Sequence, residues 1–367
     1  MEIPLTACPP VRTMTITRRN NPSRSPAVMV AHGPALFDSG DAARLMGLFA
    51  PSRVIVAGVM ARTAAEESGL PVEFDGRPPS RVIMDTEGPV FLANRGKTPH
   101  SGRVFGEIVA SRLGSGGLVH IECSDGRVYC WNGGDRLLAA DCAARAGYTV
   151  TEAWTTDFPP GRTRKIRGCI PGEPVYVNGI VIGHATAETV ELQSDDGVIG
   201  LVSGLVPKPH GLEKLGRAGT IEIGTAWCKS GQIRSAAARA GRRAARHGRI
   251  VVIDHCGHSL YPRLSGDCCG VVAVGDDTTA VCGHICLHRG IPVLGITDND
   301  ADTILPSAFA PGSVILDTRP ERDDDIGAEI AASVPHTAVF WDNFIREVIS
   351  RLSGRAAVVL DLREALP

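Results

Sequence analysis

Short apolar segments alternate with longer segments of helical periodicity in the first part of the chain. The apolar segments that we interpret as strands are residues 26–31, 53–58, 81–85, 117–123 and 148–154. Helices are expected between them, near residues 42–49, 59–69, 103–112 and 134–146. Strands that alternate with helices at this spacing are typical of a parallel sheet with helices on its faces. The pattern predicts a Rossmann-like α/β domain over residues 26–156.

The pattern changes after residue 156. Residues 157–164 have the Pro-rich and Gly-containing composition of a linker. Residues 165–206 contain short β-branched runs that Pro-Gly, Asn-Gly and Asp-Gly dipeptides interrupt. These dipeptides favour turns and hairpins. We therefore expect a small β-rich, barrel-like module as an insert in the α/β fold.

A connector over residues 207–249 follows this module. Lys208, His210 and Lys214 near its start could extend a phosphate-binding surface or belong to an exposed connector. Residues 220–229 are a candidate strand, and residues 232–247 are rich in helix-forming Ala and Arg. The arginines of the expected helix could bind RNA, but no aromatic residues are interleaved with them. A solvated helix face is favoured.

A second α/β region is predicted over residues 250–367, and four of its strands end in acidic clusters. The clusters are Asp254 with His255, Asp276 with Asp277, the group of Asp298, Asp300 and Asp302, and Asp317. In an open parallel sheet the functional crevice lies beyond the carboxyl ends of the strands. Carboxylates gathered there repel one another unless a cation lies between them. The sequence predicts a Mg²⁺ or Mn²⁺ site; turn and helix-cap roles for the same residues are the alternative.

One strand–helix–strand unit spans residues 271–302 and carries two of these clusters. A right-handed crossover makes its strands parallel, so both clusters should open on the same edge of the sheet. Gly275 precedes the expected helix. Thr278 and Thr279 at its start could cap the helix, and the free N–H groups there could hold a phosphate.

Asp254 and His255 are the candidate catalytic residues. An imidazole has an ordinary pKa near neutral, so His255 is suited to act as a general acid or base. A strand that ends in Asp-His is also found in metal-dependent phosphoesterases, where such residues bind a metal pair.

Cysteine and histidine are concentrated between residues 255 and 288. Cys282 and Cys286 are four residues apart, as are His284 and His288, so each pair shares one helix face. Zn²⁺ requires four such ligands in a tetrahedron, but no Cys-x-x-Cys pair is present. A Zn²⁺ site is therefore less favoured than buried thiols with solvent-facing histidines.

The loops after the first two predicted strands could also contact a ligand. His32, Asp38 and Ser39 follow the first strand, and Arg62 follows the second. Ligand groups occupy such positions in doubly wound domains, whereas turn and cap roles are the alternative. No G-x-G-x-x-G fingerprint is present, so a dinucleotide cofactor is not indicated.

Composition narrows the class of protein. A net charge of −2 provides no general attraction to nucleic acid or to membrane surfaces, so a nucleic-acid partner is possible but not favoured. No apolar run is long enough to predict a membrane span. Residues 1–25 lack the features of a signal peptide and are expected to be disordered. Eleven cysteines without such a signal favour reduced thiols in the cytoplasm. A homo-oligomer remains possible.

Three stretches together resemble a known family. Residues 177–185 with 208–216, residues 274–285 and residues 291–302 are similar to an uncharacterised archaeal family, found mainly in methanogens and catalogued as a domain of unknown function. The resemblance spans most of the chain from about residue 27. It implies an archaeal setting and no established activity.

A looser resemblance is to the Toprim domain of primases and topoisomerases. Asp254, Gly275 and the pair Asp298 and Asp300 follow the order of its acid, glycine and Asp-x-Asp positions. The first acid in a Toprim domain is Glu rather than Asp, and the first interval is short here. This resemblance implies a nucleic-acid-acting protein as one alternative.

We predict a Mg²⁺-dependent enzyme that acts on a phosphorylated small molecule or nucleotide. Asp276, Asp298 and Asp300 would hold the cation, with Asp277 and Asp302 beside them, and the cation would bridge phosphate oxygens. The competing class is a non-enzymatic binding or accessory protein for a methanogen cofactor or metalloenzyme, which would use the same cleft.

Overall fold

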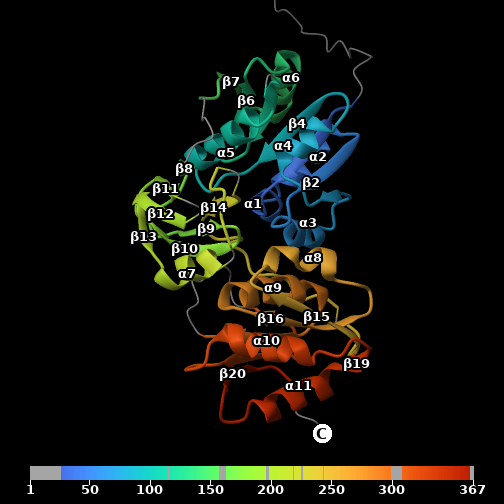
Figure 1. The fold of residues 1–367 in the computed structure, drawn as a ribbon. Coiled ribbons are helices and arrows are strands. Elements are labelled where there is room, and N and C mark those ends of the chain that lie inside the picture. The colour runs from blue at the N-terminus through green and yellow to red at the C-terminus, as the bar shows by residue number, and fades with distance from the viewer. Residues whose placement is uncertain are drawn as a thin grey trace, which may run out of the picture.

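The computed structural model describes residues 26–114, 116–156, 163–195, 198–217, 219–224, 226–242, 244–298 and 308–363. Within these ranges the chain forms an N-terminal α/β domain, a β module and a C-terminal α/β domain (Figure 1). The mixed α/β architecture with parallel sheets confirms the predicted fold class. None of the described helices has both the length and the apolar character needed to cross a membrane.

The N-terminal domain is built on a seven-stranded sheet with the order β3-β2-β1-β4-β5-β6-β7. Its strands are β1 (Val28–His32), β2 (Arg53–Ala57), β3 (Glu73–Asp75), β4 (Val90–Asn94), β5 (Leu118–Glu122), β6 (Arg127–Trp131) and β7 (Thr149–Ala153). Its helices are α1 (Ala35–Asp38), α2 (Asp41–Phe49), α3 (Arg62–Ser68), α4 (Pro79–Met84), α5 (Pro99–Ser111) and α6 (Arg136–Ala146). Neighbouring strands are parallel except in the β5–β6 hairpin. The strand order reverses at β1 and β4, which makes this pair the topological switch point.

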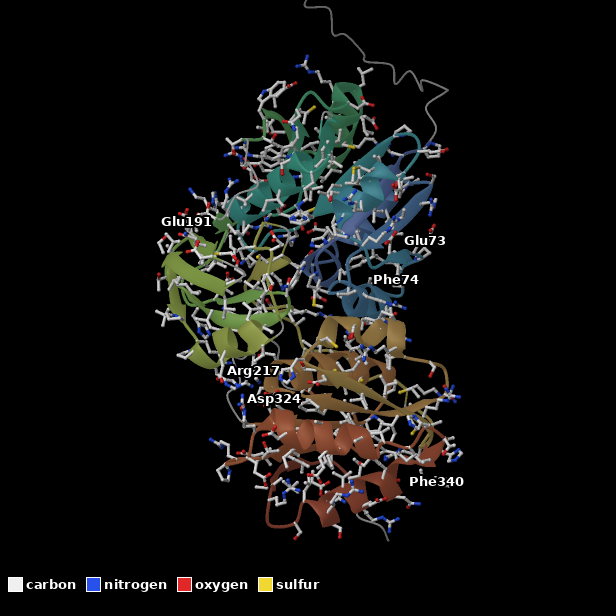
Figure 2. All side chains as sticks on the ribbon, in the orientation of Figure 1. Glu73, Phe74, Glu191, Arg217, Asp324 and Phe340 are labelled. Carbon is white, nitrogen blue, oxygen red and sulfur yellow. The ribbon has the colours of Figure 1, made fainter. Side chains whose placement is uncertain are left out.

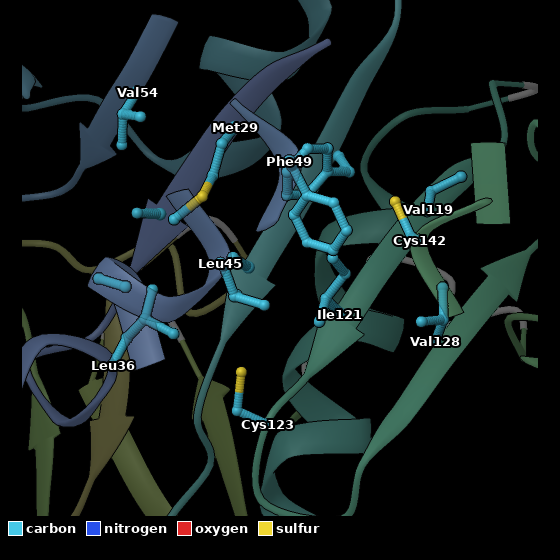
Figure 3. Packing of buried hydrophobic residues seen from close by; sticks show 14 of the residues in the cluster. Met29, Leu36, Leu45, Phe49, Val54, Val119, Ile121, Cys123, Val128 and Cys142 are labelled. Carbon is cyan, nitrogen blue, oxygen red and sulfur yellow. The ribbon is translucent and has the colours of Figure 1, made fainter. Parts of the chain in front are cut away.

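Both faces of this sheet are buried. Met29 packs in one hydrophobic cluster with Leu45 and Phe49 (Figure 3), whereas its neighbour Val30 packs in the cluster on the other face. Successive side chains of a strand point to opposite faces, so a strand covered on both sides is apolar at every position. This explains why the central strands could be recognised as continuous apolar runs.

The prediction of a strand over residues 81–85 is wrong. These residues lie in and just after α4, which begins at Pro79. Proline is favoured in the first turn of a helix, because its ring presets φ and its missing N–H would have no partner there. The strand expected at this point in the chain is β4 instead, which pairs with β1.

The β module contains two small sheets, with the orders β13-β10-β9-β14 and β12-β11-β8. Its strands are β8 (Thr163–Arg167), β9 (Pro174–Val177), β10 (Ile180–Ala185), β11 (Thr189–Asp195), β12 (Val198–Ser203), β13 (Leu205–Pro207) and β14 (Cys228–Ser230). Helix α7 (Pro209–Arg217) packs on β10. The module thus extends beyond the expected range of 165–206. The candidate strand over 220–229 is only partly correct, because β14 contains its last two residues and Ser230.

The expected Arg-rich helix is absent from the described part of residues 232–247. Arg234 is instead buried and forms ion pairs with Asp38 and Glu67 of the N-terminal domain. The backbone N–H of Gly241 donates to the Leu287 carbonyl. These tertiary contacts stabilise the segment in an irregular conformation. Their contribution to the free energy outweighs the helix propensity of its residues.

The C-terminal domain has a six-stranded sheet with the order β19-β15-β16-β17-β18-β20. Its strands are β15 (His247–Asp254), β16 (Cys268–Val274), β17 (Val293–Thr297), β18 (Val314–Asp317), β19 (Val339–Phe340) and β20 (Ala357–Asp361). Its helices are η1 (Gly257–Ser259), α8 (Leu260–Arg263), α9 (Asp276–Arg289), α10 (Asp323–Ser333) and α11 (Trp341–Arg351). Strands β15 to β18 are adjacent and parallel, as the strand–helix–strand prediction requires.

Candidate functional site

The acidic residues predicted from the sequence meet at one edge of the C-terminal sheet. Asp254 pairs in register with Val274, and Val274 pairs with Ile296. Gly275 directly follows β16 and Asp298 directly follows β17, so both lie at the carboxyl ends of the strands, as Asp254 does. Asp300 and Asp302 lie outside the described residues.

Helix α10 adds two carboxylates that the sequence analysis missed. Its first turn carries Asp323, which is completely buried, and Asp324. The signal was a run of three aspartates, which the structure places in the first turn of α10. Acidic residues in the first turn of a helix usually interact favourably with the helix dipole. The sequence pattern therefore gave no reason to place these two at the acidic edge of the sheet.

The β module supplies the opposite wall of the site. A pocket is lined by Lys208, His210 and Lys214 from the module and by His255, Gly275 and Thr278 from the C-terminal domain, together with the β9–β10 turn and Asp276 and Asp277. Its interior measures about 30 Å³, which is enough for a cation or one or two water-sized groups. A larger ligand would extend toward solvent.

Ion pairs join the two walls. Lys214 Nζ lies 3.2 Å from Asp323 Oδ2. Arg217 lies beside Asp324 where the module meets α10, with a 3.2 Å contact between NH1 and Oδ2 (Figure 2). The module is therefore held against the acidic edge by opposite charge.

Two groups of three side chains are close enough to share an ion. In each group, one ligand atom per residue lies within 4.8 Å of the others: His210, Asp298 and Asp323 form one group, and His255, Asp323 and Asp324 form the other. The His210 Nε2 to Asp298 Oδ2 distance is 3.5 Å. The His255 Nε2 to Asp324 Oδ1 distance is 3.4 Å. Since Asp323 belongs to both groups, it is the centre of the arrangement.

Burial sets the charge state of Asp323. Desolvation raises the pKa of its carboxyl group, Lys214 lowers it, and the neighbouring Asp298 raises it further. The pKa of Asp254 is lowered instead, chiefly because the His255 imidazole donates a hydrogen bond to it. A cation at the site would lower the pKa of Asp323 and stabilise its charged form.

His255 is held in an uncommon conformation. Its φ is +47°, in the left-handed region that non-glycine residues rarely adopt. Its Nδ1 is engaged by Asp254, while its buried Nε2 forms no hydrogen bond with the residues that the structure describes. The same holds for Asp298 Oδ1. Local strain and unsatisfied buried polar atoms are found together at ligand sites.

The residues predicted to bind phosphate do not all lie in the pocket. Gly275 is the N-cap of α9, with φ +97°, and no side chain caps that helix. The prediction that Thr278 or Thr279 caps α9 is therefore wrong. Thr278 lines the pocket, whereas the Thr279 hydroxyl lies 3.4 Å from the Ala273 carbonyl and is buried.

The candidate residues of the N-terminal loops do not line this pocket. Asp38 pairs with Arg234, and Ser39 donates to Asp41. Arg62 pairs with Glu66 and lies over the Tyr261 ring. His32 lies at the end of β1. The pocket is thus formed by the β module and the C-terminal domain.

The cysteines and histidines of α9 divide between the core and the domain interface. Cys282 and Cys286 are fully buried, and burial raises the pKa of both thiols. His284 is also buried, so the expectation of solvent-facing histidines is wrong for this residue. In the described part of the chain, no cysteine belongs to a group that could share an ion.

Comparisons with known proteins agree with the resemblance found in the sequence. A family described as an uncharacterized protein conserved in archaea (DUF2117) matches residues 29–338. An uncharacterized protein of Methanocaldococcus jannaschii is 30% identical over 329 residues, which cover 82% of this chain and 88% of the relative. No solved structure matches the chain. The matched span includes all the described residues of the pocket, and the chain belongs to the archaeal family DUF2117.

Proposed function

We propose that the pocket binds a divalent cation and that the protein is an archaeal enzyme acting on a phosphorylated small molecule or nucleotide. The reaction would be phosphoryl transfer or phosphoester hydrolysis. The observation that carries this proposal is the convergence of Asp298, Asp323 and His210 from three separate elements. His210 also lines the pocket, together with Lys208 and Lys214.

The types of ligand group favour a cation that binds both carboxylate and imidazole. Carboxylates suit Mg²⁺, Ca²⁺ and Mn²⁺, whereas imidazole suits transition metals. A group of two carboxylates and one imidazole therefore supports Mn²⁺ or a similar transition metal over Mg²⁺. In this assignment the cation lies between His210, Asp298 and Asp323.

The charges around the pocket support a phosphate as the reacting group. Lys208 and Lys214 line one wall and attract anions. Asp276 and Asp277 line the other wall at the start of α9, and their charges would repel a free phosphate. A cation that bridges carboxylate and phosphate oxygens resolves this conflict, as in many phosphoryl-transfer sites.

His255 is suited to move the proton in this proposal. Asp254 accepts a hydrogen bond from its Nδ1, which fixes the ring and directs Nε2 toward the acidic edge. A histidine positioned in this way can act as a general acid or base.

Ten cysteines in the described part of the chain are free, which agrees with a cytoplasmic location.

A binding protein without turnover would use the same pocket and is the second candidate. A Toprim-like, nucleic-acid-acting protein has less support. The segment expected to bind RNA is not helical in its described part, and Arg234 within it is buried. Strongly salt-dependent RNA binding would nevertheless favour that alternative.

A thermal-shift screen of nucleotides and phosphorylated metabolites with Mg²⁺, Mn²⁺ or EDTA tests the proposal. We expect Mn²⁺ to stabilise the protein by a few degrees, and one ligand to add to this only when the cation is present. Asp298→Asn should abolish both effects, and Asp141→Asn, which changes an exposed acid on α6, should keep them. Turnover of the stabilising ligand then separates enzyme from binding protein. Unchanged cation binding in Asp298→Asn would overturn the assignment.

A further inference from the structure

A second set of basic side chains lies at the switch point of the N-terminal sheet. His32 ends β1, and Lys97 follows β4 in the loop that leads to α5. Strand β14 of the β module lies next to this loop: Lys97 Nζ is 3.3 Å from the Ser230 hydroxyl. Lys229 precedes Ser230 in β14. Ligands of doubly wound domains bind where the strand order reverses, which is the position of these residues.

Lys229 has few partners for a lysine surrounded by protein. Among the residues that the structure describes, its Nζ donates one hydrogen bond, to the Gln232 carbonyl at 3.1 Å, and it lies 5.9 Å from the centre of the Tyr176 ring. Within the described residues, no carboxylate forms an ion pair with it. Glu173, the nearby acid, is bound by Lys97 and by the backbone N–H of Ile170. An ammonium group has three donors, so two of those on Lys229 are available to a ligand.

His32 presents the complementary group. Its Nδ1 lies 3.0 Å from the Ala57 carbonyl, and since a carbonyl can only accept, Nδ1 carries the proton. Its ring stacks on Phe105 with 4.5 Å between centroids. The orientation of the imidazole is therefore fixed, and its Nε2 is left as a hydrogen-bond acceptor. Both His32 and Lys229 keep part of their surface open to solvent.

The electrostatics of these groups favour an anion as the ligand. Desolvation, with a smaller contribution from Lys97, lowers the pKa of Lys229 to about 7, and Glu173 only partly offsets this. Desolvation also lowers the pKa of His32 to about 4, and the charge of Lys229 contributes. Three basic groups near one another, with one carboxylate among them, would be stabilised by a bound negative charge.

We propose that Lys97, Lys229 and His32 form a second ligand site, separate from the metal pocket, that binds an oxyanion carrying a hydroxyl group, such as hydrogen phosphate. The Lys229 ammonium binds a charged oxygen, and Lys97, whose donors are directed to Glu173 and Ser230, adds positive charge. The Nε2 atom of His32 accepts a hydrogen bond from the P–OH group. A carboxylate or a sulfate has no such hydroxyl at neutral pH and forms a hydrogen bond with Lys229 only.

Lysine acetylation followed by mass spectrometry tests this site on the intact chain. The reactivity of each lysine is measured against pH with EDTA present, so that no cation occupies the metal pocket. Without phosphate, the reactivity of Lys229 should rise with a midpoint near pH 7. Saturating inorganic phosphate should raise that midpoint and reduce the reactivity at pH 7 roughly tenfold, because a bound anion favours the ammonium form. Sulfate should protect less than phosphate.

Variants make the result specific. Lys229→Met should lose the thermal stabilisation that phosphate causes in EDTA, while Lys165→Met, a change of an exposed lysine on β8, should keep it. Asp298→Asn should also keep it, because that residue belongs to the proposed cation site with His210 and Asp323. Failure of the proposed metal function would leave these results unchanged. If phosphate does not protect Lys229, or if sulfate protects it equally well, the proposal is overturned.

Discussion

Lys214 Nζ lies 3.2 Å from Asp323 Oδ2, although the two residues are on different parts of the fold. Lys214 is on α7 of the β module, and Asp323 begins α10 of the C-terminal domain. The Asp323 side chain is 0% exposed and that of Lys214 is 12% exposed, so water screens this pair only weakly. The contact joins a residue that lines the pocket to the acidic edge, and it balances the charge of the fully buried Asp323.

Lys214→Met should strongly destabilise the protein at neutral pH. The substitution leaves Asp323 buried without its cation, and breaking a buried pair in this way costs about 3–5 kcal/mol. Because the folded-state pKa of Asp323 is already raised, its protonation favours the fold, and the loss should shrink as the pH falls through that pKa. Urea unfolding at neutral and mildly acidic pH measures both effects.

The matched control for this variant is Lys165→Met. Lys165 lies 4.0 Å from Glu191 on the exposed surface of the β module, and such pairs contribute less than about 1 kcal/mol. Mn²⁺ should stabilise Lys214→Met more than the unmodified protein, because the ion replaces the lost charge. Equal destabilisation in the two variants would contradict the role given to Lys214.

Arg234→Met should uncouple the N-terminal domain from the rest of the chain. The Arg234 guanidinium is 4% exposed and contacts Asp38 at 2.6 Å and Glu67 at 2.7 Å. We expect a loss of about 3–5 kcal/mol, since Glu67 remains buried without a partner. Arg234→Lys should recover little of it, because an ammonium cannot form the same planar fork. Urea unfolding measures the loss, and Arg136→Met, which removes an exposed pair with Glu152, should change little.

The stability of the fold should decrease as the pH falls from about 6.5 to 4. Burial and the nearby Arg234 charge lower the pKa of His284 from 6.5 to about 4. In this interval the unfolded chain binds a proton at His284 that the folded chain does not. Each pH unit of acidification between the two pKa values therefore favours unfolding by about 1.4 kcal/mol. His284→Gln should flatten the pH dependence of the unfolding free energy. An unchanged slope would exclude His284 as its source.

Gly275→Ala should impair the cation site more than the fold. A Cβ atom there would lie 2.9 Å from His255 Nε2, and φ at Gly275 is +97°. The backbone penalty alone is about 1–3 kcal/mol, because φ of +97° with ψ of 145° is a conformation that glycine almost alone adopts. Gly69→Ala is the matched control, because φ is +66° there and nothing lies within 4 Å of the added carbon. Thermal shifts with Mn²⁺ should decrease only in Gly275→Ala; retention of the full shift would separate His255 from cation binding.

The acidic edge could be predicted because its components are local in the sequence. Strands β16 and β17 are buried on both faces, so nearly all their positions are apolar and the ends of the strands can be recognised in the sequence. Asp298 follows directly after such a strand. A parallel sheet then brings its carboxyl ends together whatever the rest of the chain does. The position of Asp323 could not be predicted in this way, because the residue begins a helix and does not follow a strand.

The sequence by itself thus determined the α/β class, the parallel order of the acid-tipped strands and the family. Only the tertiary structure decided that His210 and Lys214 face Asp298 and Asp323, since no local pattern encodes contacts between residues about 90–110 positions apart. It also decided the conformation of the Arg-rich segment. Helix propensity amounts to less than about 1 kcal/mol per residue. The buried ion pairs of Arg234 and the close approach of Gly241 to the His288 carbonyl outweigh it there.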